Sequence, residues 1–151
     1  MKVASIIVVC LGNICRSPLG AALLVRGLPG VEVTSAGVAA PLAQPADPTV
    51  QRIAEGLDLD LAEHRSRLLT TEMVNSAELI LVLDDKIRTM VRERWPHAWG
   101  KAMLFDHWST RTGIADPVGR SEEFHRATAE QICAASDLWI DRLSKGAVHG
   151  G

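Results

Sequence analysis

The stretch that decides the fold is VCLGNICRSP, residues 9–18, which joins an apolar run to a segment rich in alanine and leucine. Residues 5–9 (SIIVV) are short, apolar and β-branched, as expected of a strand covered on both faces. We expect Ser17 to be an N-cap and Pro18 to be the first residue of the helix that follows. The chain therefore begins with a strand, a tight loop and a helix.

Strand and helix patterns alternate along the rest of the chain. Further strands are predicted at residues 31–35, 78–83 and 102–105. Helices are predicted to start at Asp47 and Pro48, at Thr70 or Thr71, and at Asp84 and Asp85, with Pro96 ending the last of these. Residues 106–119 show no helix or strand pattern. Irregular segments of this length in compact domains usually have a function.

The C-terminal segment has the pattern of one more helix. Apolar residues recur near helical spacing, which predicts that they face the core: Phe124, Ile132, Ala135, Trp139 and Leu143. We place the domain at residues 1–145 and predict a flexible tail at 146–151, where glycine ends the chain.

The alternation of strands and helices predicts crossover connections. We therefore expect a single α/β domain with a central four-stranded parallel sheet and helices on both faces, which suits a chain of 151 residues. Ligands bind such sheets at the carboxyl ends of the strands. The loop after the first strand lies at such an end.

Composition excludes several classes of protein. With 18 acidic against 16 basic residues, the chain has no excess of positive charge for binding nucleic acid. Its cysteines are odd in number, so they form no disulfide framework and favour a reducing, cytoplasmic setting. The cysteines and histidines lack the paired spacing that is typical of zinc sites, so we expect no metal site. No apolar run reaches the ~18–20 residues that span a bilayer, and the N-terminal run lacks a signal-peptide cleavage pattern, so we expect no membrane insertion.

The loop itself predicts a site for a tetrahedral anion. Gly12 and Asn13 tolerate positive φ, so successive backbone N–H groups can point inward and form a nest at the start of the helix. Arg16 adds a planar fork of donors that matches two phosphate oxygens. We therefore predict a phosphate-binding loop directly after the first strand.

The same positive field favours the thiolate form of Cys10. Ser17 can donate its hydroxyl hydrogen to that sulfur, and a thiolate at the floor of a phosphate cradle is a nucleophile aimed at phosphorus. The alternative is a buried structural cysteine beside a surface arginine. The strand before the loop and the helix start after it favour the functional interpretation.

Such a nucleophile needs a proton donor for the leaving group. Asp116 lies in the long polar stretch and can protonate the departing oxygen, then accept a proton from the attacking water. Spacing alone leaves Asp106 and Asp85 as alternatives. Because a phenol has a pKa near 10, far below that of an alkyl alcohol, a single acid favours phosphotyrosine over phosphoserine.

Several motifs together carry a family resemblance. VCLGNICRSP, TSAG, HRSR, ILVLD and ADP occur in the order and approximate spacing of the low-molecular-weight protein tyrosine phosphatases, so the chain resembles that family over nearly its whole length. The resemblance implies that Cys10 is the nucleophile, Arg16 the phosphate clamp and Asp116 the general acid. It assigns the phosphate-binding loop to Leu11, Gly12, Asn13, Ile14, Cys15 and Ser17.

The resemblance also implies supporting roles. Ser35 and His64, with Asn13 and Ser17, match the network that braces the loop, with His64 an uncharged bracket rather than a base. Cys15 matches a neighbour that can form a protective disulfide with Cys10. No cofactor is implied.

Two further stretches, GKAMLFDHW and IADP, resemble phosphatases of exopolysaccharide operons. Those enzymes act on the tyrosine-rich tail of a membrane tyrosine kinase, which we expect as the partner. The family usually has tyrosine after Asp-Pro, whereas Val118 and Gly119 follow here. An aromatic wall is also absent, because Ala40, Pro41 and Leu42 occupy that region.

Three other functions share parts of this pattern. An arsenate reductase of the same fold would need two further cysteines after the third strand, and residues 84–100 contain none. A non-catalytic phosphate or phosphopeptide binder would need neither Cys10 nor Asp116. A phosphocysteine carrier needs no acid to activate water and usually no arginine in the loop.

Overall fold

A computed structural model describes residues 2–149, with side chains described for residues 2–144. In this part of the chain, one parallel sheet has the strand order β2-β1-β3-β4. The strands are β1 (Ser5–Cys10), β2 (Glu32–Gly37), β3 (Leu79–Val82) and β4 (Ala102–Leu104). The predicted four-stranded parallel sheet is confirmed, with strand ends within one or two residues of their predicted positions.

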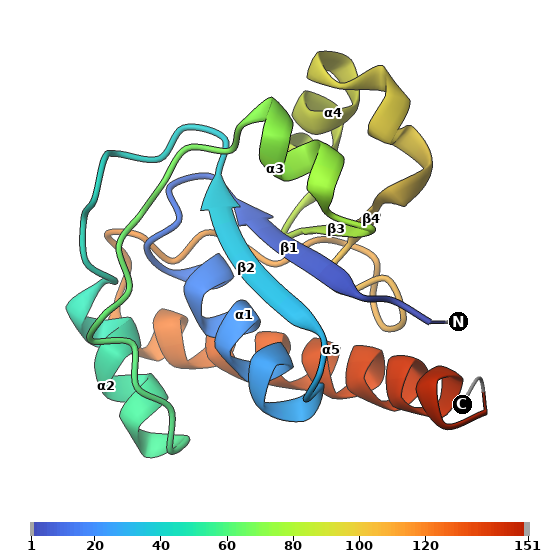
Figure 1. Cartoon of the computed structure of the whole chain (residues 1–151). Helices are drawn as coiled ribbons and strands as arrows, with labels where there is room; N and C mark the ends of the chain where they lie inside the picture. The colour runs from blue at the N-terminus through green and yellow to red at the C-terminus, as the bar shows by residue number, and fades with distance from the viewer. Residues whose placement is uncertain (1, 150–151) are drawn as a thin grey trace.

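Helices cover both faces of the sheet (Figure 1). They are α1 (Arg16–Gly27), α2 (Pro48–Gly56), α3 (Thr71–Ser76), α4 (Asp85–Arg94), the 3₁₀ helix η1 (Pro96–Lys101) and α5 (Glu122–His149). In Figure 1, α1 and α5 lie on one face and α3 and α4 on the other. None of the helices described is both long and apolar enough to cross a membrane.

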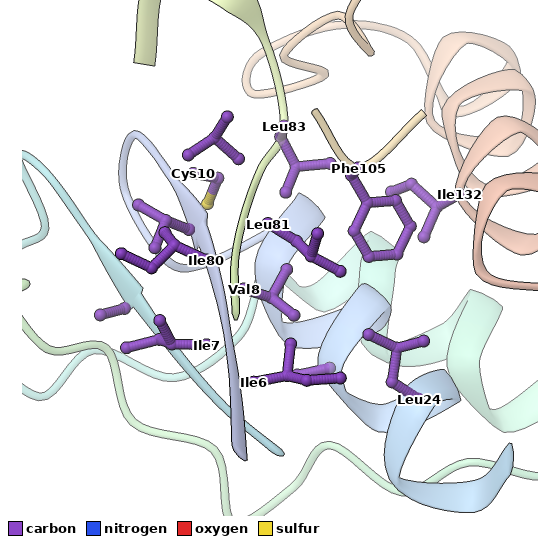
Figure 2. Close-up of a cluster of buried hydrophobic side chains, with 14 of the residues drawn as sticks. Ile6, Ile7, Val8, Cys10, Leu24, Ile80, Leu81, Leu83, Phe105 and Ile132 are labelled. Carbon is purple, nitrogen blue, oxygen red and sulfur yellow. The ribbon is translucent and has the colours of Figure 1, made fainter. Parts of the chain in front are cut away.

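The core lies around the two central strands. Every residue of β3 is buried, as is every residue of β1 except Ser5, which is why both strands are continuous apolar runs. Figure 2 shows Ile6 and Val8 pointing toward α1, where Leu24 lies, while Ile7 and Ile80 lie on the opposite face. Complete burial of such a side chain stabilises the fold by about 1.5–3 kcal/mol. The end of β1, and with it the loop that follows, is therefore held firmly.

Two predicted helix caps are present. Asp47 Oδ1 accepts a hydrogen bond from Thr49 N at 2.8 Å, and Thr70 Oγ1 accepts one from Met73 N at 3.3 Å. Asp84 caps α4 in the same way. These side chains satisfy amide groups that have no carbonyl partner in the first turn of a helix.

The predicted cap of the first helix is wrong. The helix starts at Arg16, the N-cap position is Cys15, and no side chain caps it. Ser17 lies inside the first turn and is completely buried. Its hydroxyl instead forms hydrogen bonds with Cys10 and Asn13. The backbone N–H groups at the start of this helix therefore have no side-chain cap.

The last helix departs from prediction at both ends. Ile132, Ala135, Trp139 and Leu143 are buried as predicted. Phe124 is not part of this buried stripe: it is half-buried in the first turn, with the Arg120 guanidinium 4.2 Å from its ring centre. The helix continues to His149, past the predicted boundary at residue 145. Residues 150–151 of the predicted tail lie outside the described residues, and its flexibility stays a prediction.

Residues 106–119 contain no helix or strand, as predicted. Ile114 N donates to Leu83 O at 2.8 Å, which fixes this segment at the carboxyl end of β3. At the end of β2, Gly37 lies so close to the loop after β1 that a Cβ there would be 2.6 Å from Leu11 O. Two segments distant in sequence thereby meet the loop at one edge of the sheet.

Candidate active site

Cys10 is the last residue of β1, and its sulfur faces the loop that follows. The side chain is 2 % exposed. Asn13 N donates to Sγ at 3.2 Å, and Ser17 Oγ lies 2.9 Å from the same sulfur. The structure therefore brings Cys10, the loop backbone and Ser17 together, as the sequence predicts.

Asn13 organises the loop. It is completely buried and has a φ of +56°, a conformation that asparagine tolerates better than most residues. Asn13 Oδ1 accepts from Arg67 N at 3.0 Å, which fixes the orientation of the amide. Nδ2 then donates to Ser17 Oγ at 2.8 Å and to Ser35 Oγ at 3.0 Å. One side chain thus joins the loop to β2 and to the segment containing Arg67.

These contacts leave the Ser17 hydroxyl hydrogen available to Cys10. A hydroxyl has a single hydrogen, and Ser17 Oγ already accepts from Asn13 Nδ2. The Ser17 hydrogen is therefore free to point at Cys10 Sγ. Cys10 Sγ can then accept hydrogen bonds from both Ser17 Oγ and Asn13 N.

His64 supports the loop from outside. Its Nε2 lies 2.7 Å from Asn13 O, and because a carbonyl only accepts, Nε2 carries the hydrogen. Burial lowers the pKa of His64 below its ordinary value of 6.5; the bond to Asn13 O opposes this shift, and the charges of Arg65 and Arg67 add to it. The lowered pKa favours the neutral imidazole, and the ring contacts the backbone of the loop at Asn13.

Arg16 is buried at the mouth of the loop, with 2 % of its surface exposed. Nη1 donates to Asp84 Oδ2 at 2.8 Å and to Ile114 O at 2.7 Å. Nη2 lies 3.8 Å from Asp116 Oδ2. The guanidinium is therefore held in one orientation by groups from two other segments of the chain.

Sequence reasoning missed Asp84 as a site residue and treated it only as negative charge at the start of a helix. In the structure it caps the helix and also contacts the site: Oδ1 accepts from Ile87 N at 2.9 Å, while Oδ2 pairs with Arg16. Its position could have indicated this, because it follows the central strand β3 at the edge where ligands bind.

The three candidate acids separate clearly. Asp116 lies beside Arg16, is 37 % exposed, and accepts from Val118 N through Oδ1 at 3.1 Å. Asp106 is buried and braces its own loop by accepting from Thr110 Oγ1 and from the amides of residues 112 and 113. Asp85 is exposed and pairs with Arg88. Of the three, Asp116 is the one that contacts Arg16.

Apolar side chains flank the loop. Leu11, Leu42 and Val118 are exposed, and Leu42 is the most exposed of them at 85 %. Ala39 N donates to Leu11 O at 2.9 Å, so the segment that carries Leu42 lies alongside the loop. These three aliphatic side chains form the rim of the loop, and the rim includes the region where the sequence lacks an aromatic wall.

Cys15 lies behind the loop. Both Cys10 and Cys15 are free thiols. Burial raises the pKa of the Cys15 thiol, and the charges of Asp47 and Asp116 raise it further. The Cys15 sulfur, an Asp47 carboxylate oxygen and a His125 ring nitrogen lie within 4.8 Å of one another. Cysteine and histidine spacing did not predict this set of possible metal ligands, since its members come from three separate segments.

Comparison with known proteins identifies the family. Residues 5–148 match the model of the family described as low molecular weight phosphotyrosine protein phosphatase. The chain belongs to this family. Membership confirms the predicted resemblance and makes the chain a phosphatase.

Relatives in the phosphatase family match over nearly their full lengths. The low molecular weight protein-tyrosine-phosphatase Etp of Escherichia coli K12 is 40 % identical over 145 residues, which cover 96 % of this chain and 98 % of Etp. The tyrosine phosphatase Wzb of Escherichia coli K30, solved in complex with sulfate, has a TM-score of 0.91 and 37 % identity, covering 94 % and 99 % of the two chains. The YwlE arginine phosphatase of Geobacillus stearothermophilus has a TM-score of 0.93 and 33 % identity, covering 98 % and 97 %.

Proposed function

We propose that this phosphatase hydrolyses phosphotyrosine in proteins through a cysteinyl-phosphate intermediate. The observation that carries the proposal is the convergence of Cys10, Arg16 and Asp116 at the carboxyl end of β1. A phosphate group in the loop would meet backbone N–H donors and the Arg16 guanidinium on its oxygens, with the Cys10 sulfur below the phosphorus. The relatives named as protein-tyrosine-phosphatases support the same substrate class.

In the first step, the Cys10 thiolate forms a bond to phosphorus as the bond between phosphorus and the phenol oxygen breaks. Asp116 gives its proton to that oxygen, so tyrosine leaves as a neutral phenol. Asp116 Oδ2 lies 3.8 Å from Arg16 Nη2, so this carboxyl group is next to the guanidinium that would hold the phosphate.

In the second step, water attacks phosphorus and the bond between sulfur and phosphorus breaks. Asp116, now a carboxylate, takes a proton from the water, and Cys10 returns to the thiolate. Ser17 stabilises that leaving thiolate through its hydroxyl hydrogen. Inorganic phosphate is released and no cofactor is consumed.

The exposed rim contributes to the choice of substrate. Leu11, Leu42 and Val118 offer apolar contact to the ring of a phosphotyrosine side chain. The physiological substrate that we propose is the tyrosine-rich tail of a membrane tyrosine kinase that controls exopolysaccharide synthesis or export, met in the cytoplasm. The resemblance to the exopolysaccharide-operon phosphatases supports this assignment.

The test compares wild type with Cys10→Ser and Asp116→Ala on p-nitrophenyl phosphate. We expect Cys10→Ser to abolish turnover and Asp116→Ala to lower kcat by about 10²–10⁴-fold, with the exposed Asp85→Asn as a matched control that retains activity. Turnover by Cys10→Ser would exclude the mechanism.

Substrate class is tested on matched peptides carrying phosphotyrosine, phosphoserine or phosphoarginine, with arsenate reduction in parallel. We expect the highest kcat/KM for phosphotyrosine and no arsenate reduction, since residues 84–100 supply no further cysteine. A preference for phosphoarginine would instead place the chain with the arginine phosphatase that it resembles in structure.

A further inference from the structure

We propose that Cys15, Asp47 and His125 bind a Zn²⁺ ion directly behind the phosphate-binding loop. Their ligand atoms, one sulfur, one carboxylate oxygen and one ring nitrogen, lie within 4.8 Å of one another. Cys15 is at the start of α1, Asp47 at the start of α2 and His125 in the first turns of α5. The fold thus brings three kinds of metal donor together from three elements.

A second observation supports the site independently of these distances. His125 is only 4 % exposed, and its Nδ1 is buried without a hydrogen-bond partner among the described residues. Buried polar atoms normally have a partner, and leaving one without costs about 1–3 kcal/mol. Coordination of a cation by the imidazole would give this buried nitrogen a partner and order the ring.

Asp47 can bind a metal without losing its structural role. Its Oδ1 accepts from Thr49 N and Val50 N and so caps α2. No hydrogen bond within the described chain uses Oδ2. One oxygen therefore holds the helix while the other is available to the ion.

The donor set and the space both suit zinc. Sulfur, nitrogen and oxygen donors at ~2.0–2.3 Å are typical of Zn²⁺, whereas Mg²⁺ and Ca²⁺ prefer oxygen alone. A cavity of about 10 Å³, lined by Cys15, Arg16 and His125 among mostly apolar side chains, lies next to this cluster and has room for one small occupant, although Asp47 is not part of its lining. Tetrahedral bonds of that length place ligand atoms roughly 3.3–3.8 Å apart, so side-chain movements on the order of 1 Å complete the site.

Charge also balances in this site. Zn²⁺ binding would form a bond to the Cys15 sulfur and displace the thiol proton to solvent, and an Asp47 carboxylate oxygen and a His125 ring nitrogen would supply the other two bonds. The thiolate and the carboxylate together offset the two positive charges of the ion, and the charge of Arg16, which lines the same cavity, is paired with Asp84. A neutral cluster is the form that a buried position favours.

Zinc at this site would act on the phosphate-binding loop. Cys15 is adjacent to Arg16 in the chain, so the ion would tie the loop to α2 and α5 and occupy the Cys15 sulfur. We expect Zn²⁺ to raise Tm and to slow the alkylation of Cys15, neither of which depends on the phosphatase mechanism.

The direct test is Co²⁺ substitution in the full chain, because a thiolate bound to Co²⁺ gives a charge-transfer band in the near ultraviolet. We expect one Co²⁺ per chain, displaced by Zn²⁺. Cys15→Ser should abolish the band, and His125→Asn and Asp47→Asn should each weaken binding by at least about 10-fold. Asp47→Asn is the most informative of these variants, because asparagine still caps the helix.

Two cysteine variants serve as controls. Cys133→Ser and Cys10→Ser should keep the band, since neither sulfur belongs to the cluster. The absence of a thiolate band, or a band that depends on Cys10 and survives Cys15→Ser, would overturn the proposal. Thermal unfolding of each variant with a chelator present establishes that it is folded.

Discussion

Arg16 and Asp84 form an ion pair at the mouth of the loop, with Nη1 and Oδ2 2.8 Å apart across 68 residues of sequence. Arg16 is buried and Asp84 is 30 % exposed. The pair fixes the orientation of the guanidinium, whose Nη2 lies toward Asp116. A fixed guanidinium binds phosphate without first having to be ordered, which lowers the entropic cost of binding.

Asp84→Asn tests this relationship. Asparagine can still cap α4, so stability should change little, but the loss of the charged partner should lower kcat/KM by about 10-fold, as expected for a positioning contact of roughly 1.4 kcal/mol. Steady-state kinetics and Tm measure the two effects separately. Asp85→Asn is the matched control, and an unchanged kcat/KM in Asp84→Asn would contradict the positioning role.

Ser17→Ala should lower kcat by about 10–100-fold, because a hydrogen bond to a charged group contributes roughly 1.5–3 kcal/mol. The rate of Cys10 alkylation by iodoacetamide at neutral pH should also fall, because the thiolate loses a donor. A purely structural role of Ser17 would leave this rate unaltered. Ser136→Ala is the control: Ser136 is equally buried, but its hydroxyl bonds to Cys133 O, away from the loop.

Asn13→Gly and Asn13→Ala separate backbone strain from side-chain bonding. Both lose the bonds to Ser17, Ser35 and Arg67, so both should reduce activity strongly. Alanine also has to adopt a φ of +56°, which should make Asn13→Ala less stable than Asn13→Gly by about 1–2 kcal/mol. Urea denaturation measures this difference, and equal stabilities would refute the strain argument.

Stability should fall as the pH drops below about 6.5. Burial lowers the pKa of His64, so in this range the unfolded chain binds more protons than the folded one, and acid favours unfolding. His64→Gln, which retains a donor for Asn13 O, should flatten the profile between pH 7.5 and 5.5. Burial also lowers the pKa of His107, so a residual slope should remain. If stability depended on pH with the same slope in wild type and in His64→Gln, His64 would not be the source of the pH dependence.

Leu42→Phe should lower KM for a phosphotyrosine peptide by about 2–10-fold, because an aromatic pair is worth roughly 0.5–1.5 kcal/mol. Leu42 is 85 % exposed, so the larger ring should not disturb the core. Inhibition by inorganic phosphate should not change, since phosphate alone does not reach the rim. Leu138→Phe, at an exposed position on α5, is the control.

The sequence by itself determined the local parts of this protein. The apolar runs predicted the strands, and Asp47, Thr70 and Asp84 marked the helix starts, because periodicity and capping act over a few residues. The local sequence also allowed the surroundings of Cys10 to be predicted, since Asn13 and Ser17 are three and seven residues from it. A short loop between a strand and a helix allows few other arrangements.

Tertiary structure alone decided which distant groups complete the site. Asp84 and Ile114 reach Arg16 across 68 and 98 residues, and Cys15, Asp47 and His125 meet from three elements. No local pattern encodes such contacts, because they depend on how the crossover connections bring loops to one edge of the sheet. The same arrangement turned Ser17 from a predicted helix cap into a hydrogen-bond partner of Cys10, since Asn13 is held by Arg67 and directs its amide at the Ser17 hydroxyl.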